Sequence, residues 1–433
     1  MPEPRSAPDT RTTATYVRLT LATVVALLLV VGGFNLVVDP FAMYRLSTRD
    51  GLNSYKPATF TRMRLFKAYE VRQVAPRTII LGSSRSHLGF SCAHAGLRAL
   101  DGPCYNLAFD GALPREMRAY LEHAARIAPL RTVVLGLDSF HLVNGPSSTR
   151  PDFDGRVLYS EAAPRAATWV TGDLRLLTTW DTLRTSVETV QRQHEASPGW
   201  FAPDGQRLGE VFFHTAEPTF IADGPRAYFD SIDRQEIADQ TPAPDGPNGS
   251  AAPPDAPQMH ALDDVRSIVR FCLERGIDLR ILLTPSHVHQ YEIARAVGAW
   301  PRIVQSKRDL VTLLDEEAAR TGRPAPPLWD FLRYSSVTTE TPPATGSRDE
   351  FQFYWDSSHF KQVVGDAVLD RVTGAAAPRG PADLGDRLTA ANIDAELAAQ
   401  DVARVSYART RADDVAAIEA QVAARRAELA QAR

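Results

Sequence analysis

The stretch RTIILGSSRSH at residues 77–87 decides the fold of this chain. It begins as a short apolar run rich in β-branched residues and turns polar directly after Gly82. This pattern predicts a buried strand with polar side chains at its carboxyl end. Similar apolar runs recur farther along the chain, at residues 105–109, 131–137, 277–284 and 328–331.

Helical patterns separate these predicted strands. We expect helices at about residues 93–100, 115–127, 263–275 and 302–320, and a last core helix that begins at His359. Strands that alternate with helices predict an α/β fold, in which helices cover both faces of a parallel sheet.

The regular pattern fails between residues 141 and 260. Only a possible helix at residues 173–193 stands out there, so we expect an irregular insertion. The insertion ends in a proline-rich run, residues 241–257, which predicts a mobile surface loop. The tail from about residue 388 is rich in Ala, Arg and Glu, and we expect helices there that pack loosely or project.

Residues 19–38, LTLATVVALLLVVGGFNLVV, carry no charge. A membrane-spanning helix needs about 20 such residues, and no small-residue cleavage site follows the run. The alternative is a helix buried in a soluble core. Arg5, Arg11 and Arg18 precede the run, which places the N-terminus in the cytoplasm, although several Lys and Arg residues also follow it. We therefore predict a single-pass protein of the inner (cell) membrane, whose main domain faces the periplasm or the cell exterior and which has the lipid bilayer as a partner.

The composition excludes some classes of partner. The 433 residues carry a formal net charge of −4 with no basic stripe, which argues against a nucleic-acid partner. No Cys/His cluster has metal-ligand spacing, so we expect neither a metal nor a cofactor. Cys92 and Cys104 either form a disulfide, which an extracytoplasmic compartment would allow, or are small buried residues, and we expect Cys272 in the core.

Polar side chains follow several of the predicted strands. The residues concerned are Ser83-Ser84-Arg85, Asp110-Gly111, Asp138-Ser139 and Ser286-His287, and a further block near the end of the chain contains Asp356 and His359. In open α/β sheets ligands bind beyond the carboxyl ends of the strands. We therefore expect these residues to lie at one edge of the sheet.

The order of these blocks resembles the SGNH (GDSL-like) hydrolase and acyltransferase family, in particular membrane-anchored members of bacterial envelopes. The resemblance implies a flavodoxin-like three-layer α/β/α domain with a parallel sheet. It implies Ser84 in Gly82-Ser83-Ser84 as the nucleophile and Gly111 as a donor to the oxyanion hole. Asp356 and His359, spaced three apart, would complete a catalytic triad.

One block departs from the family pattern, because Asp138 stands where the family usually has an Asn that donates to the oxyanion. A carboxylate there would repel the oxyanion unless it were protonated or turned away, and Arg85 is the nearest candidate for a replacement donor. His287 either lines the substrate cleft or is a loop residue. Tyr354 and Trp355 would exclude water or stack on a sugar ring.

These features predict a serine esterase or O-acyltransferase that acts on an envelope glycan or a related acyl ester. The alternative is a catalytically silent protein of the same fold that binds polysaccharide or scaffolds polysaccharide-assembly partners; the missing Asn favours it. The sequence divides into a tail (1–18), a membrane helix (19–38), a connector (39–76), an α/β domain (77–375) with its insertion (141–260), and a helical tail (376–433).

A reporter enzyme that works only outside the cytoplasm should be active when it is fused after Arg433, because residues 39–433 are expected to lie on the outer side of the membrane. Activity of a cytoplasm-specific reporter at the same position would contradict this topology.

Overall fold

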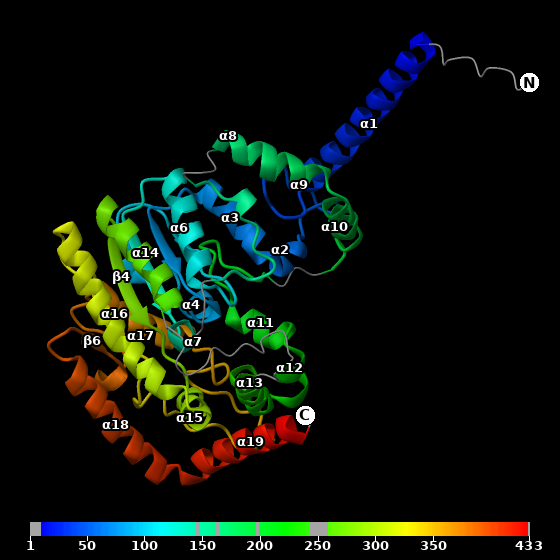
Figure 1. Ribbon diagram of the computed structural model, residues 1–433. Helices are drawn as coiled ribbons and strands as arrows, with labels where there is room; N and C mark the ends of the chain where they lie inside the picture. The colour runs from blue at the N-terminus through cyan, green and yellow to red at the C-terminus, as the bar shows by residue number, and fades with distance from the viewer. Residues whose placement is uncertain (1–9, 144–147, 161–164, 196–198, 242–258, 432–433) are drawn as a thin grey trace, which may run out of the picture. The chain divides into compact units, whose positions relative to one another are not determined.

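A computed structural model describes residues 10–143, 148–160, 165–195, 199–241 and 259–431 (Figure 1). Nearly all of the predicted mobile loop at 241–257 lies outside the described residues. The contacts group the chain into two compact units, residues 1–70 with 154–197, and residues 71–153 with 198–433. Residues 154–197 of the predicted insertion therefore belong with the N-terminal helix, and its other residues belong with the sheet.

The first unit is built around one long apolar helix, α1 (Thr10–Val38), which is long and apolar enough to cross a membrane. Its side chains are exposed as far as Val30, and packing begins at Val31. The other elements of this unit are α2 (Ala58–Thr61), most of α3 (Met63–Val74), η1 (Gly155–Val157), α8 (Arg165–Thr168), the π-helical η2 (Trp169–Leu174), α9 (Arg175–Thr178) and α10 (Trp180–Gln191).

The second unit contains a six-stranded sheet of order β2-β1-β3-β4-β5-β6. Its strands are β1 (Thr78–Leu81), β2 (Cys104–Asn106), β3 (Thr132–Leu137), β4 (Asp278–Leu283), β5 (Leu328–Asp330) and β6 (Asp386–Leu388). The first five are parallel, as the alternation of strands and helices predicts. The sixth pairs antiparallel with β5 and was not predicted, because it is a three-residue edge strand within a polar stretch.

Helices surround this sheet. The helices of this unit that lie between β1 and β4 in the sequence are α4 (Ser84–Gly89), α5 (Ala95–Arg98), α6 (Pro114–Ile127), α7 (Ser139–Val143), α11 (Gly209–Thr215), α12 (Pro218–Asp223), α13 (Pro225–Gln240) and α14 (Met259–Arg275). The later ones are α15 (Val288–Val297), α16 (Trp300–Thr321), α17 (Gln362–Thr373), η3 (Ala382–Leu384), α18 (Ile393–Thr410) and α19 (Ala412–Gln431).

Burial explains why the strands form where they do. Every residue of β1 and β3 is buried, as expected for parallel strands covered on both faces. Ile80, Val134 and Leu282 form a core cluster with Val364 and Val368 of α17. Elsewhere α14 packs against both α6 and α16, and it also contacts β4.

The expectation of a loose or projecting tail is wrong. Helix α19 packs against α15 and α13, and its Ile418 and Val422 are buried in a cluster with Ile237 and Ile293. The apolar residues recur three and four positions apart, which gives α19 a narrow apolar face that its alanine-rich composition conceals.

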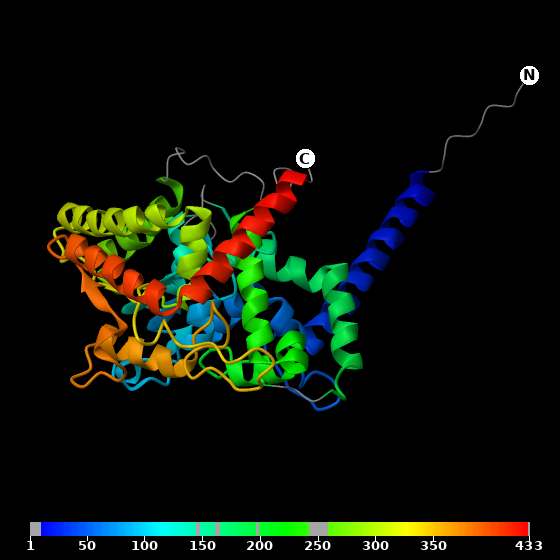
Figure 2. The ribbon, with the colours of Figure 1, turned by 90° about the horizontal axis from the view of Figure 1, so that it is seen from below.

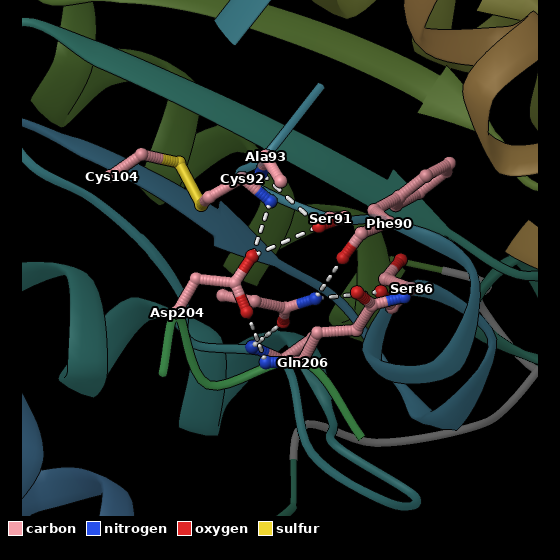
Figure 3. The surroundings of a disulfide bond; sticks show 10 residues. Ser86, Phe90, Ser91, Cys92, Ala93, Cys104, Asp204 and Gln206 are labelled. Atoms are coloured by element: carbon pink, nitrogen blue, oxygen red, sulfur yellow. Dashed lines mark hydrogen bonds between the residues drawn. A yellow bond between two sulfur atoms is a disulfide. The ribbon is translucent and has the colours of Figure 1, made fainter. Parts of the chain in front are cut away.

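Cys92 and Cys104 form a disulfide that ties the segment after α4 to the start of β2 (Figure 3). Beside it, the Asp204 carboxylate accepts hydrogen bonds from the Cys92 N–H at 2.7 Å and the Ser91 hydroxyl at 3.1 Å. Cys272 is fully buried, as predicted, and burial raises the pKa of its thiol to about 12.

Helices α4 and α17 approach so closely that no side chain fits between them. A Cβ at Gly365 would overlap the carbonyl oxygen of Gly89. Gly365→Ala should therefore lower the free energy of unfolding by about 1–3 kcal/mol, the usual cost of overpacking, in a chemical denaturation measurement. Val363→Ala, on an exposed position of the same helix, is the control and should change stability by less than about 0.5 kcal/mol. Equal stability of both variants would show that this contact is not tight.

Candidate active site

The serine of the first motif lies at the carboxyl end of β1, beside the point where the strand order reverses. Chain connections leave β1 towards β2 on one side and return to β3 on the other, and such reversal points hold ligands in open α/β sheets. Gly82 ends the strand with φ +155°, and a Cβ there would overlap the Ser86 hydroxyl. The Ser83 side chain then caps α4, so that Ser84 is the first helical residue and is half-buried.

Ser84 meets the late Asp/His block across 275 positions of sequence. Its Oγ lies 2.8 Å from Nε2 of His359. Nδ1 of His359 lies 2.7 Å from Oδ2 of Asp356, which is fully buried. The three side chains predicted from sequence therefore form a continuous hydrogen-bonded chain.

The hydrogen bonds of Asp356 define the tautomer of His359. Oδ1 of Asp356 accepts the backbone N–H groups of Ser358 at 2.6 Å and His359 at 2.9 Å, and an ionised carboxylate can only accept. Nδ1 of His359 therefore carries its proton towards Asp356. Nε2 is left as the acceptor for the Ser84 hydroxyl, which is the arrangement that activates a serine.

The last core helix does not begin at His359, as expected, but at Gln362. Residues 355–359 form a tight turn instead, closed by a 2.8 Å hydrogen bond from the Trp355 N–H to the His359 carbonyl. The physical reason is that Asp356 uses its side chain to cap this turn, which leaves Lys361, in extended conformation, at the start of the helix.

Neighbouring elements hold this turn against the nucleophile. Arg85, the residue after Ser84, donates from Nε to the Ser358 carbonyl and from Nη2 to the Ser358 hydroxyl, both at 2.9 Å. From α15, Gln290 donates to the Ser357 hydroxyl at 2.9 Å, and the His287 backbone N–H donates to the Ser357 carbonyl at 3.0 Å. The turn is thus tied both to α4 and to the start of α15.

Asp138 lies beneath these groups and is fully buried. Its carboxylate accepts hydrogen bonds from the hydroxyls of Ser83 and Thr284, and Nη1 of Arg85 lies 3.7 Å away. Burial alone would raise the pKa of Asp138, but the positive charge of Arg85 and the hydrogen bonds from the Ser83 and Thr284 hydroxyls outweigh it and lower the pKa. Asp138 is therefore an ionised group turned into the protein, one of the two ways in which a carboxylate at this position avoids repelling an oxyanion.

His141, which the sequence analysis left out of the site, connects the end of β3 to the loop that contains Gly111. Its Nδ1 accepts the Asp138 N–H at 2.9 Å and its Nε2 donates to the Ala112 carbonyl at 2.8 Å. Burial lowers the pKa of His141, so the ring stays neutral and keeps one donor and one acceptor. Only the neutral ring satisfies both contacts.

Two backbone N–H groups are the expected donors to a developing negative charge. They belong to Ser84, at the first position of α4, and to Gly111, where φ is +60°. Within the described part of the chain, neither N–H has a hydrogen-bond acceptor. Two nitrogens of the Arg85 guanidinium donate to Ser358, and the third, Nη1, lies 3.7 Å from Asp138 in an ion pair that is too long for a hydrogen bond.

A carboxylate–arginine pair that the sequence analysis missed borders the triad. Asp110 accepts a 2.6 Å hydrogen bond from Arg207 and lies 3.3 Å from Nδ1 of His87. Burial acts to raise the pKa of Asp110, but the positive charge of Arg207 and the hydrogen bond with His87 lower it overall. Asp110 was visible in sequence as a strand-end residue, whereas Arg207 belongs to the insertion, where no pattern marked it.

Three residues with a predicted substrate role lie in the interior. The His287 side chain is buried and bonded to the Glu340 carbonyl at 2.7 Å, and burial lowers its pKa well below the ordinary value. Tyr354 is fully buried, and Trp355 is stacked on Phe213 with ring centroids 4.8 Å apart. None of these side chains has a face open to a sugar ring, and their rings serve the core.

The described residues contain no group of three or more His, Cys, Asp or Glu side chains that could hold a metal ion. No protein-family model and no curated protein matches this chain. The geometry of the triad and the pattern of the sequence are therefore what any assignment has to rest on.

Replacing Asp138 with Asn should lower the free energy of unfolding by about 3–5 kcal/mol at neutral pH, because it leaves Arg85 as an unpaired buried cation. The pKa of Asp138 is lowered in the fold, so its contribution is present above the unfolded-state pKa of about 4 and is lost as pH falls through the lower folded value. The stability difference between the variants should therefore shrink in acid.

Asp278→Asn removes a surface Asp–Arg pair and is the matched control, with an expected cost below about 1 kcal/mol. Chemical denaturation at several pH values measures both variants. If Asp138→Asn proves as harmless as Asp278→Asn at neutral pH, the carboxylate does not organise the site.

Proposed function

We propose that this protein is a membrane-anchored serine esterase or O-acyltransferase, which acts through an acyl-enzyme on Ser84. The observation that carries the proposal is the hydrogen-bonded chain from Ser84 Oγ to His359 Nε2, at 2.8 Å, and from His359 Nδ1 to Asp356, at 2.7 Å. A buried acid, an oriented imidazole and a half-exposed hydroxyl in this order are what acyl transfer requires.

In the first half of the reaction, Ser84 Oγ attacks the carbonyl carbon of the acyl ester and its proton passes to Nε2 of His359. The carbonyl oxygen becomes an oxyanion, to which the N–H groups of Ser84 and Gly111 donate, and one such donor contributes roughly 3–4 kcal/mol to the transition state. When the intermediate collapses, the C–O bond to the alcohol breaks, and the alcohol leaves with the proton from His359.

In the second half, His359 takes a proton from an acceptor hydroxyl, which attacks the acyl-enzyme. The bond to Ser84 breaks, and Ser84 regains its proton from His359. Water as the acceptor gives hydrolysis, and a sugar hydroxyl gives transfer. Asp356 stabilises the imidazolium in both halves.

The fold supports assignment to the SGNH family. The first five strands follow the order 2-1-3-4-5, the order of flavodoxin-like sheets, and helices pack around them. We therefore propose a three-layer α/β/α SGNH domain. In this domain Asp138 replaces the usual Asn as a structural residue, and the oxyanion hole relies on two backbone donors.

The setting we propose is the outer side of the inner membrane, with an envelope glycan or a related acyl ester as substrate and polysaccharide-assembly proteins as partners. Helix α1 supplies the anchor. The disulfide between Cys92 and Cys104 is typical of proteins that fold outside the cytoplasm. Two of the cations that follow α1 in sequence form ion pairs within the fold: Arg45 pairs with Glu70 at 2.5 Å and Arg62 with Asp181 at 3.0 Å.

Hydrolysis of a small acetyl ester by the purified full-length chain tests the mechanism. Ser84→Ala and His359→Ala should each reduce turnover by roughly a thousand-fold or more, and the double variant should lose no more than either alone, since the residues act as a unit. Asp356→Asn should cost less than the loss of the serine. Ser267→Ala, on the exposed face of α14, should behave as wild type.

Esterase activity that survives Ser84→Ala would refute the mechanism. A folded wild-type protein that turns over no ester, with or without a sugar acceptor, would favour the catalytically silent alternative, to which the absence of the third-block Asn points.

A further inference from the structure

One surface region of the first unit has a buried polar side chain and exposed apolar side chains, the reverse of the usual arrangement. On the helical segment α8–η2–α9, Gly172 and Asp173 are buried, and Asp173 accepts a 2.6 Å hydrogen bond from Tyr69. Val170 and Leu174, four positions apart, are 55 % and 42 % exposed. The polar side chain points inward and the apolar side chains point outward, which water does not favour.

The surface continues into α10. Trp180, its first residue, is 76 % exposed, one of the most exposed large apolar side chains in the described chain. Tryptophan is enriched where proteins meet the interface between water and lipid, because its ring is apolar and its N–H is polar. Together, Val170, Leu174 and Trp180 are called the apolar ridge below.

Helices α9 and α10, which carry Leu177, Thr178 and the ridge residue Trp180, pack directly against α1. The Leu177 carbonyl and the Thr178 side chain come within 3.9 Å of the place where a Cβ of Gly32 would stand. Farther along, Asn35 is buried; it donates to the Leu177 carbonyl at 2.7 Å and accepts from Ser186 of α10 at 2.8 Å. Figures 1 and 2 show α8–α9 crossing α1 near its base, while α10 runs beside that base.

The length of α1 indicates that the contacts with α9 and α10 lie at the depth of the membrane boundary. If the hydrocarbon begins after Arg18, the exposed stretch at residues 19–30 supplies only about 18 Å of helix, against about 30 Å of hydrocarbon. The bilayer must then extend over the part of α1 that α9 and α10 cover. If the hydrocarbon begins at Thr13 instead, with Arg18 extended to the interface, 30 Å of helix ends near Gly32, at the level of Thr178.

We propose that the apolar ridge is a second membrane contact: Val170, Leu174 and Trp180 insert into the boundary between headgroups and acyl chains, and α8–η2–α9 lies along the membrane plane. The proposal rests on the membrane anchoring of α1 proposed above. Two exposed arginines lie near the ridge in sequence, Arg175, which pairs with Asp154 at 3.3 Å, and Arg184, which lies 4.0 Å from Asp181. In the proposed orientation they are at the headgroup level, where a lipid phosphate competes with the aspartates for them. Two contacts of this kind limit how the first unit can rotate about its anchor.

Spin labels on the full-length chain test the proposal in nanodiscs of phosphatidylcholine and phosphatidylglycerol. Single cysteines are introduced at Leu174 and Trp180, at Leu27 in α1 as the lipid reference, and at Glu188 as the aqueous control on α10. The native cysteines do not interfere, because Cys272 is buried and the others are paired. The measurement is the accessibility of each label to oxygen, which partitions into lipid, and to a water-soluble nickel chelate.

Labels at 174 and 180 should resemble the label at 27, with nickel accessibility several-fold lower than at 188. If 27 is in lipid and both 174 and 180 are as accessible to nickel as 188, the ridge is not a membrane contact, although α1 still anchors the chain. If 27 is itself accessible to nickel, the anchoring fails and the ridge fails with it.

A second measurement needs no label, in case a cysteine variant does not fold. In nanodiscs that contain brominated lipid, tryptophan fluorescence of the wild type should be quenched more than that of Trp180→Phe. Equal quenching of the two proteins would contradict the proposal.

Discussion

The buried carboxylate of Asp138 is the constraint on which the site depends. It follows β3, accepts the hydroxyl of Ser83 after β1 and the hydroxyl of Thr284 after β4, and faces the guanidinium of Arg85. Three adjacent strand ends are thereby tied to one charge. Such a charge is costly to bury unless it is well paired, so the strand ends have one strongly preferred arrangement.

Arg85 carries this constraint to the catalytic base. Its remaining nitrogens bind the carbonyl and hydroxyl of Ser358, between Asp356 and His359. Ser84 and His359 are 275 positions apart in the sequence, so the elements that carry them set the distance between the two side chains. The distance from Ser84 to His359 is therefore a consequence of where the Asp138–Arg85 pair positions α4 and the turn at residues 355–359.

The residues of the triad could be predicted from the sequence because parallel topology brings the carboxyl ends of the strands to one edge of the sheet. Ser84 after β1 and the Asp356/His359 pair were marked by short motifs in the order that a known family shows. The role of Arg85 could not be read, because a long side chain reaches groups that only tertiary structure brings near. His287 could not be read either, since a strand-end histidine has the same sequence signature whether it lines a cleft or is buried, as here.

The strands of the central sheet were predicted for a similar reason, as buried apolar runs stand out against polar loops. The weaker elements were not. The sequences of helices α11 to α13 show no clear apolar period, and β6, with three residues, is too short to show an alternating pattern. The apolar face of α19 consists of a few residues among many alanines. These elements form because of the surfaces they contact.

The most direct test of the central claim, that Ser84 is an activated nucleophile, is covalent capture. The folded full-length protein is incubated with a fluorophosphonate, and mass spectrometry identifies the modified peptide. The account predicts one adduct, on Ser84, that forms far more slowly in His359→Ala, because the base that takes the serine proton is gone. A folded protein that forms no adduct, or forms it on another serine at the same rate in both proteins, would contradict the account.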